Sequence, residues 1–152
     1  MLSFDRRTLM RLAPLALLLF AAPIMGGQPE GLAEWEHNHY RGAHALGDWV
    51  KQNPDAAKAF FDWDGEYPDA AKLFVGWAVN NRTAPIELFL KNHPNMTYFS
   101  DMSQQHRTAF NAFIAWCRAY PAAAEGLFNH PLGLKWIGAH LSEAASRMKH
   151  AK

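Results

Sequence analysis

Apolar side chains from residue 32 onward recur at intervals of three and four residues, with polar residues between them. This spacing places them on one face of an α-helix. The clearest stripe consists of Ala109, Phe110, Phe113, Ile114, Trp116 and Cys117. The pattern predicts an all-α fold, a compact array of about six or seven short helices, at 32–52, 54–63, 68–80, 85–92, 102–119, 121–129 and 131–149.

The composition of residues 95–104 predicts where one of these helices begins. "NMTYFS", residues 95–100, has the composition of a strand but no partner strand, so we expect a loop or a single turn there. Asp101 and Gln104 resemble a capping box, which predicts that the next helix begins at residue 102.

A recurring phrase predicts where one helix ends and the next begins. An aromatic residue stands five positions before a proline in "WVKQNP", "WDGEYP", "FLKNHP" and "WCRAYP". Proline fits the first position of a helix, and the residue before it is kept out of the helical region. Asn53 is a suitable N-cap for the helix that begins at Pro54. Each phrase therefore predicts a tight corner, with the aromatic residue in the last turn of the preceding helix.

Two of these phrases belong to a repeat of fourteen residues. "WVKQNPDAAKAFFDW", residues 49–63, is followed directly by "DGEYPDAAKLFVGW", residues 64–77, and Trp49, Trp63 and Trp77 share the spacing. The prolines could kink one long helix or break it, and Asp64-Gly65 and Asn80-Asn81 favour breaks because they suit helix interiors poorly. The three tryptophans are then expected in the core at the corners, with a platform on which a ligand stacks as the alternative binding role.

The tandem phrases "FLKNHP" and "LFNHP" resemble short helical repeats begun by proline that occur in some exported bacterial proteins of unassigned role. The likeness covers about residues 46–141. It implies a compact or solenoid-like helical array and brings no catalytic residues with it.

The first 26 residues are typical of an export signal. "MLSFDRRTLMR" is basic, and an apolar stretch follows from Leu12 to Met25, too short for a membrane span and interrupted by Pro14 and Pro23. "DRRTLM" resembles a twin-arginine signal, although an ordinary secretory signal remains open. We expect a signal peptide at 1–26, a single helical domain at 27–152 and a periplasmic or secreted location in a bacterium. An uncleaved N-terminal anchor is the alternative.

Charge and cysteine usage narrow the function classes. Without residues 1–26 the chain has twelve Lys and Arg against thirteen Asp and Glu, so no basic excess favours nucleic-acid binding. Cys117 is the only cysteine, so no disulfide within the chain is possible and the fold has to be stabilised by packing.

Histidines offer the main possibility of metal chemistry. "EWEHNHYRGAH" contains His37, His39 and His44, with Glu36 beside them. On a regular helix all three rings cannot reach one ion, because His37 and His39 point in opposing directions. A locally irregular chain could still bind Cu²⁺, Ni²⁺ or Zn²⁺ through these side chains. The alternative is that they are surface histidines of an amphipathic helix.

Other reaction centres have weaker support in the sequence. Non-covalent haem could use His106 or His140, whereas covalent attachment needs two cysteines. "DWDGEYPD" is rich in carboxylates but lacks the spacing of an EF-hand calcium loop. No nucleophile elbow surrounds any serine.

The leading hypothesis is a non-enzymatic exported protein that acts as a binding or accessory module of the cell envelope, with a protein partner there. A periplasmic metal- or haem-binding carrier, and a small subunit that escorts a redox enzyme, are the alternatives. No cofactor is the leading expectation.

Overall fold

The computed structural model describes residues 27–152, so the expected export signal lies outside the described range. The described residues form ten α-helices and no strand, which confirms the all-α prediction and corrects the expected number of helices. In chain order the helices are α2 (Leu32–Asn38), α3 (Tyr40–Gln52), α4 (Pro54–Glu66), α5 (Pro68–Asn80), α6 (Ile86–Asn92), α7 (Thr97–Gln105), α8 (Arg107–Ala119), α9 (Pro121–Phe128), α10 (Pro131–Ala139) and α11 (Leu141–Lys149).

The additional helices arise from joints that contain no proline. The predicted helix 32–52 is divided at His39, and 131–149 is divided at His140. The predicted start at residue 102 was wrong, because α7 begins at Thr97, inside the segment expected to be a loop, and ends before a further joint at His106. No proline and no other break signal marks these joints, which are followed by Tyr, Arg or Leu, so the prediction missed them.

Six of the joints are single residues with nearly the same conformation. They are His39, Asn53, Tyr67, His106, Tyr120 and His140, with φ between −133° and −119° and ψ between 41° and 65°. At each one the backbone N–H donates to the carbonyl four residues earlier, and the carbonyl accepts from the N–H four residues later. A corner residue therefore pairs both of its own backbone groups, its N–H with the preceding helix and its carbonyl with the following one, while the chain turns.

Several corner side chains close the helix that precedes them. The Asn53 amide donates to the carbonyl of Trp49 at 3.0 Å, and the Asn81 amide donates to that of Trp77 at 2.8 Å. The His140 ring bonds the carbonyl of Trp136 at 3.0 Å in the same way. Asn53 was expected to cap the following helix, but its side chain satisfies the last turn of α3 instead.

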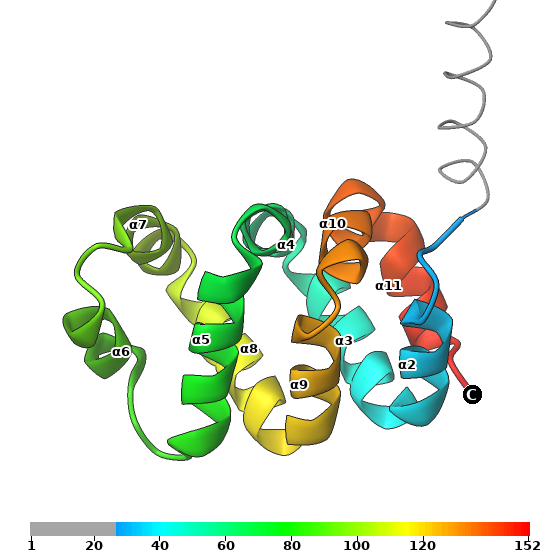
Figure 1. Cartoon of the computed structure of the whole chain (residues 1–152), viewed down its shortest axis with the longest axis horizontal. Coiled ribbons are helices and arrows are strands. Elements are labelled where there is room, and N and C mark those ends of the chain that lie inside the picture. Colours follow the sequence, from blue (N-terminus) through cyan, green and yellow to red (C-terminus); the bar gives the residue numbers. More distant parts are fainter. Residues whose placement is uncertain (1–26) are drawn as a thin grey trace, which may run out of the picture.

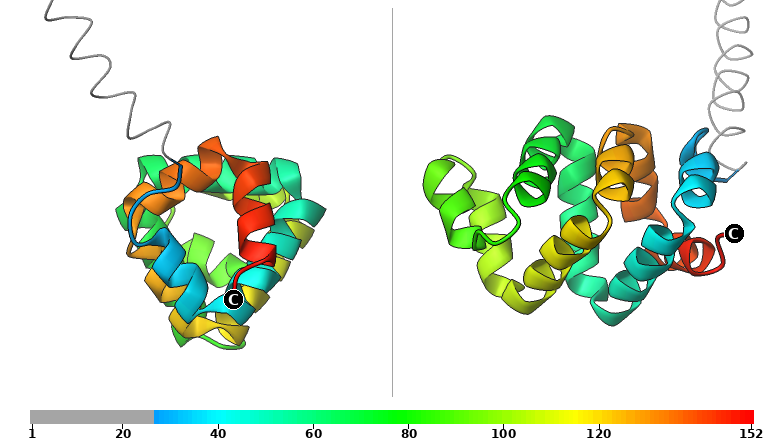
Figure 2. Two further views of the ribbon diagram at one scale, coloured as in Figure 1. Left: turned by 90° about the vertical axis from the view of Figure 1, so that its right-hand side faces the viewer. Right: turned by 90° about the horizontal axis from the view of Figure 1, so that it is seen from below.

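The helices wind twice around one axis and build a three-sided prism. One face consists of α7, α4 and α10, the second of α5, α9 and α2, and the third of α8, α3 and α11 (Figure 1). Figure 2 shows the triangular outline in the view along the axis. Helices α2 to α5 form the outward pass and α7 to α11 form the return pass, so every face alternates between the two passes. The result is a short helical solenoid in which helices of the return pass pack between helices of the outward pass.

The space inside the prism is filled with aromatic side chains. Phe60 of α4 lies at the centre of this core, with its ring centroid 4.5 Å from that of Phe113 and 5.3 Å from that of Phe110. Phe74 and Phe128 complete the contacts from α5 and α9, each with its ring centroid 6.0 Å from that of Phe60. Such tilted and edge-to-face pairs add to the stabilisation from apolar burial.

Tryptophans at the corners join the two passes by hydrogen bonds. The indole N–H of Trp35 donates to the carbonyl of Ala123 at 2.8 Å, and that of Trp116 donates to Gly42 at 2.8 Å. The two bonds are reciprocal. Each tryptophan lies in the last helical turn before its own corner, at His39 or Tyr120, and bonds a carbonyl in the first turn after the other corner. Trp49 makes the equivalent bond to the carbonyl of Ala109 at 2.9 Å. These tryptophans therefore fix how the outward and return passes lie against each other.

Replacing Trp49 by Phe should test this role. Trp49→Phe removes the indole N–H that donates to the carbonyl of Ala109, a carbonyl that also accepts within α8, and a hydrogen bond of this kind contributes about 0.5–1.5 kcal/mol. Trp77→Phe is the matched control, because Trp77 is half-buried and its indole N–H makes no hydrogen bond within residues 27–152. Urea unfolding should show that Trp49→Phe lowers the free energy of unfolding by about 1 kcal/mol more than Trp77→Phe does. Equal decreases for the two variants would contradict a stabilising role of the Trp49 hydrogen bond.

None of the helices over residues 27–152 combines the length and the apolar character needed to cross a bilayer.

Candidate functional site

The structure does not gather the predicted metal residues into one ligand set. Residues 27–152 contain no group of three or more His, Cys, Asp or Glu side chains able to hold a metal ion together. His39 is a corner residue whose ring lies 6.3 Å from that of Trp35. Glu36 is buried on α2, and burial raises the pKa of its carboxyl, an effect that the charge of Arg147 opposes.

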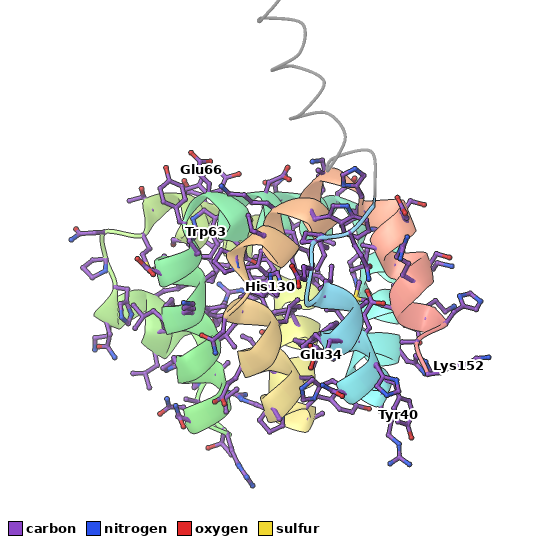
Figure 3. All side chains as sticks on the ribbon, turned by 45° about the vertical axis from the view of Figure 1, so that its right-hand side comes forward. Glu34, Tyr40, Trp63, Glu66, His130 and Lys152 are labelled. Atoms are coloured by element: carbon purple, nitrogen blue, oxygen red, sulfur yellow. The ribbon has the colours of Figure 1, made fainter. Side chains whose placement is uncertain are left out.

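Two of these histidines bind the end of the chain instead. Nδ1 of His37 lies 2.5 Å from the carbonyl of Lys152, and Nε2 of His44 lies 2.6 Å from the carbonyl of Ala151. These backbone oxygens only accept, so Nδ1 of His37 and Nε2 of His44 donate, and only the other nitrogen of each ring is left as a possible metal ligand. The C-terminus is held against α2 and α3 in this way, and Figure 3 labels Lys152 there.

The histidine that follows α9 also has a structural contact at each nitrogen. Nδ1 of His130 accepts from the backbone N–H of Gly133 at 2.9 Å, and Nε2 lies 2.6 Å from the carbonyl of Glu30. Nε2 therefore carries the proton, and the ring joins the start of α10 to the chain before α2. Figure 3 labels His130 at this junction.

The three repeated tryptophans differ in their environments. Trp49 is surrounded by the core rings of Phe60, Phe61 and Phe113. Trp77 is half-buried beneath the guanidinium of Arg118, whose Cζ lies 5.8 Å from the ring centroid. Trp49 therefore serves packing, and the guanidinium of Arg118 covers Trp77.

Trp63 differs because it borders a pocket of about 600 Å³ on the edge of the prism. The pocket lies between the last turn of α4, the first turn of α5 and the start of α7. Its lining residues are Asp62, Trp63, Glu66, Tyr67, Ala70, Asn95, Met96, Thr97, Tyr98 and Phe99. Trp63 and Glu66 are labelled at the upper edge in Figure 3. This hollow is larger than three others on the surface of residues 27–152, which have volumes of about 330 to 410 Å³.

The repeat itself positions the aromatic wall of this pocket. Trp63 precedes the corner by four residues, and its ring centroid lies 4.9 Å from that of Phe99 at the pocket floor. Tyr67 is the corner residue and is 53% exposed, while Tyr98 on α7 is 60% exposed. Two large aromatic side chains thus stand in solvent on either side of a hollow with an apolar floor. Such a combination is typical of ligand-binding surfaces.

Sequence reasoning found this site only in part. Trp63 was singled out, but the segment around Tyr98 was expected to form a loop or a single turn and was not proposed as part of a site. The pocket depends on α7 lying beside α4, a contact between residues about 35 positions apart that no local pattern reports. The signal that could have indicated the site was the presence of Tyr67 in "EYP" and Tyr98 in "MTYF", two aromatic residues in polar surroundings.

A buried carboxyl group lies close to the pocket but points away from it. Asp64 is 0% exposed, and neither of its carboxyl oxygens has a hydrogen-bond partner within the described chain. Burial raises the pKa of Asp64 well above its usual value. The carboxylates of "DWDGEYPD" therefore separate, with Asp62 and Glu66 at the pocket and Asp64 in the core.

Cys117 is buried in the core, as its place on the apolar stripe of α8 indicated. Burial raises the pKa of its thiol strongly, and the nearby Asp64 contributes in the same direction. Since the thiolate is the reactive form, the folded protein should react with Ellman's reagent far more slowly than the protein in 6–8 M urea, by about a hundredfold or more. Fast labelling without denaturant would contradict this expectation.

No protein-family model, curated protein or solved structure matches this chain.

Proposed function

We propose that this chain is a non-enzymatic binding module of the cell envelope, exported by its N-terminal segment, and that the pocket between α4, α5 and α7 holds its ligand or a side chain of its partner. The observation that carries the proposal is the pocket itself. A volume of about 600 Å³ lies within the range of ligand sites in proteins, and exposed aromatic residues border it.

The architecture supports a binding role in two further ways. The pocket walls belong to helices whose corners are fixed by hydrogen bonds, so a ligand meets a largely formed site. A preformed site loses less conformational entropy when the ligand binds. A metal carrier that uses His37, His39 and His44 together has less support, because residues 27–152 contain no group of three or more His, Cys, Asp or Glu side chains able to hold an ion.

The proposal can be tested by NMR titration of the purified protein with small cationic, anionic and neutral compounds. We expect at least one class to shift the backbone amide signals of residues 66–70 and 95–99 saturably, while those of α11 stay in place. Ala70→Phe places a ring into the pocket and should abolish these shifts. Ala115→Phe, at an exposed position of α8, is the control and should leave them unchanged.

Two results would overturn the proposal. In one, no compound of any class shifts the signals of the pocket residues. In the other, the shifts persist in Ala70→Phe, which would place the binding elsewhere on the protein.

A further inference from the structure

We infer that the pocket binds an organic ammonium group, of which a methylated quaternary ammonium ion is the best-fitting form; this inference rests on the binding function proposed above. It combines three features of the pocket: its charge, its aromatic side chains and the helix ends that border it.

The charge of the pocket lining is negative. Among its ten lining residues are the carboxylates of Asp62 and Glu66, and no Lys, Arg or His. Asp62 is engaged by Lys58, whose Nζ lies 2.7 Å from its Oδ2. Glu66 forms no ion pair within residues 27–152 and is exposed. Glu66 therefore supplies the free negative charge at this site.

The position of Glu66 on its helix adds to the negative potential. Glu66 is the last residue of α4, where the helix dipole is negative, and the last turn of α4 holds no basic residue. A carboxylate at this end of a helix is unfavourable unless a cation compensates it. Asp62 and Glu66 also border a second hollow of about 410 Å³, and Lys58 and Lys135 line that hollow but not the aromatic pocket. The side that faces the aromatic pocket is left without a cation from the described chain.

The aromatic residues fit a weakly hydrated cation. Trp63, Tyr67 and Tyr98 all line the pocket, and the two tyrosines are mostly exposed. The faces of aromatic rings attract cations, and methylated ammonium groups are suited to this interaction because they combine positive charge with an apolar surface. Met96 and the floor ring of Phe99 add further apolar contact.

The start of α7 supplies a second polar feature opposite the carboxylate. Its first residue, Thr97, lines the pocket, and no side chain within residues 27–152 caps this helix. The first backbone N–H groups of a helix lack acceptors inside the helix and point outward from its start. A ligand that carries a hydroxyl or carboxylate a few atoms from its ammonium group can therefore accept a hydrogen bond from α7 while its cation lies near Glu66.

Choline and its neutral isostere, in which carbon replaces the nitrogen, form a matched pair of probes. NMR titration of the purified protein should show saturable binding of choline at residues 66–70 and 95–99, about tenfold or more tighter than that of the isostere. The affinity for choline should fall with rising salt, because exposed charges are screened. Binding of the isostere should not respond to salt.

Single substitutions test Glu66 as the negative charge of the pocket and Tyr98 as an aromatic contact of the ammonium group. Glu66→Gln should weaken choline binding by about three- to tenfold and leave the isostere unaffected, since only the charge is removed. Glu125→Gln is the control, because Glu125 is an exposed glutamate on α9 outside the pocket, and should change neither affinity. Tyr98→Ala removes an exposed ring and should weaken choline binding to a similar degree without unfolding the protein.

The outcomes separate the ligand class from the proposed function. Equal affinity for choline and its isostere, or choline binding unchanged in Glu66→Gln, would overturn the ammonium inference. Binding of anionic or neutral compounds without choline would overturn it too, while the binding function would stand. Failure of every compound to bind at the pocket would overturn both.

Discussion

Asp64→Asn is expected to raise the free energy of unfolding by about 2–4 kcal/mol at pH 7. Asp64 is fully buried on α4 and both carboxyl oxygens lack partners within the described chain. The folded protein must either bury an unpaired charge or take up a proton at a pH where the unfolded chain has none. Keeping that proton costs about 1.4 kcal/mol for each pH unit above the ordinary pKa. The amide of Asn never ionises, so the variant avoids this cost.

The direction of the pH dependence follows from the raised pKa. The folded protein holds the Asp64 proton more tightly than the unfolded chain, whose carboxyl titrates near 3.8. The contribution of Asp64 to stability is therefore fully present below about pH 4 and is lost as pH rises toward the folded pKa. Urea unfolding between pH 4 and pH 8 should show the advantage of Asp64→Asn growing with pH. Glu36 shifts in the same direction, so the difference between the two proteins is the quantity to measure.

Asp101→Asn provides the matched control for this measurement. Asp101 is exposed on α7 and makes no ion pair within residues 27–152, so its replacement should change stability by less than about 0.5 kcal/mol at any of these pH values. If Asp64→Asn instead destabilises the protein equally at pH 4 and pH 8, the carboxyl has a hydrogen-bonded role that this structure does not contain.

The parts of the fold that follow from local chemistry were predictable from the sequence. The prolines after Asn53, Tyr67 and Tyr120 mark corners that the structure confirms, because proline restricts the residue before it. The same prediction was wrong at Pro94, where α6 ends at Asn92 and the next helix begins only at Thr97. The burial of Trp49 followed from its place in the last turn before a corner.

The missed corners have a different physical basis. At His39 the following residue is Tyr40, so no backbone restriction identifies the joint. The repeat does identify it, since Trp35 and His39 precede Trp49 and Asn53 by fourteen residues. His106 likewise precedes the corner at Tyr120 by fourteen residues, whereas no corner lies fourteen residues before His140. A break that tertiary contacts impose on a helix-forming sequence leaves little local signal.

The candidate site was largely beyond sequence reasoning because it depends on how the passes interleave. The spacing of apolar residues indicates which face of a helix is buried but not which helix covers it. The segment "DWDGEYPD" reads as one polar turn, yet residues 62–66 continue α4, which places Asp64 in the core and Glu66 at the pocket. Which carboxylate of an acidic run becomes buried depends on the direction in which the helix points each side chain and on which neighbouring helix packs over it.

Close approach of the two passes explains the second large expected effect. Gly47→Ala should lower the free energy of unfolding by about 2–3 kcal/mol, although alanine favours helices over glycine. A Cβ at Gly47 on α3 would lie 2.8 Å from the carbonyl oxygen of Ala145 on α11 and 3.2 Å from the backbone N of Lys149. Both are backbone atoms of a packed helix, so α11 has to move away from α3 to admit the methyl group.

Gly76→Ala separates this steric effect from helix propensity. Gly76 lies in the interior of α5, and a Cβ there meets nothing within 4 Å among the described residues. The same substitution should therefore stabilise the protein by about 0.5–1 kcal/mol. Thermal and urea unfolding of the two variants should move in opposite directions from the parent protein. A stabilising Gly47→Ala would mean that α3 and α11 tolerate a wider spacing, and the interleaved passes would then be less tightly fixed than their hydrogen bonds imply.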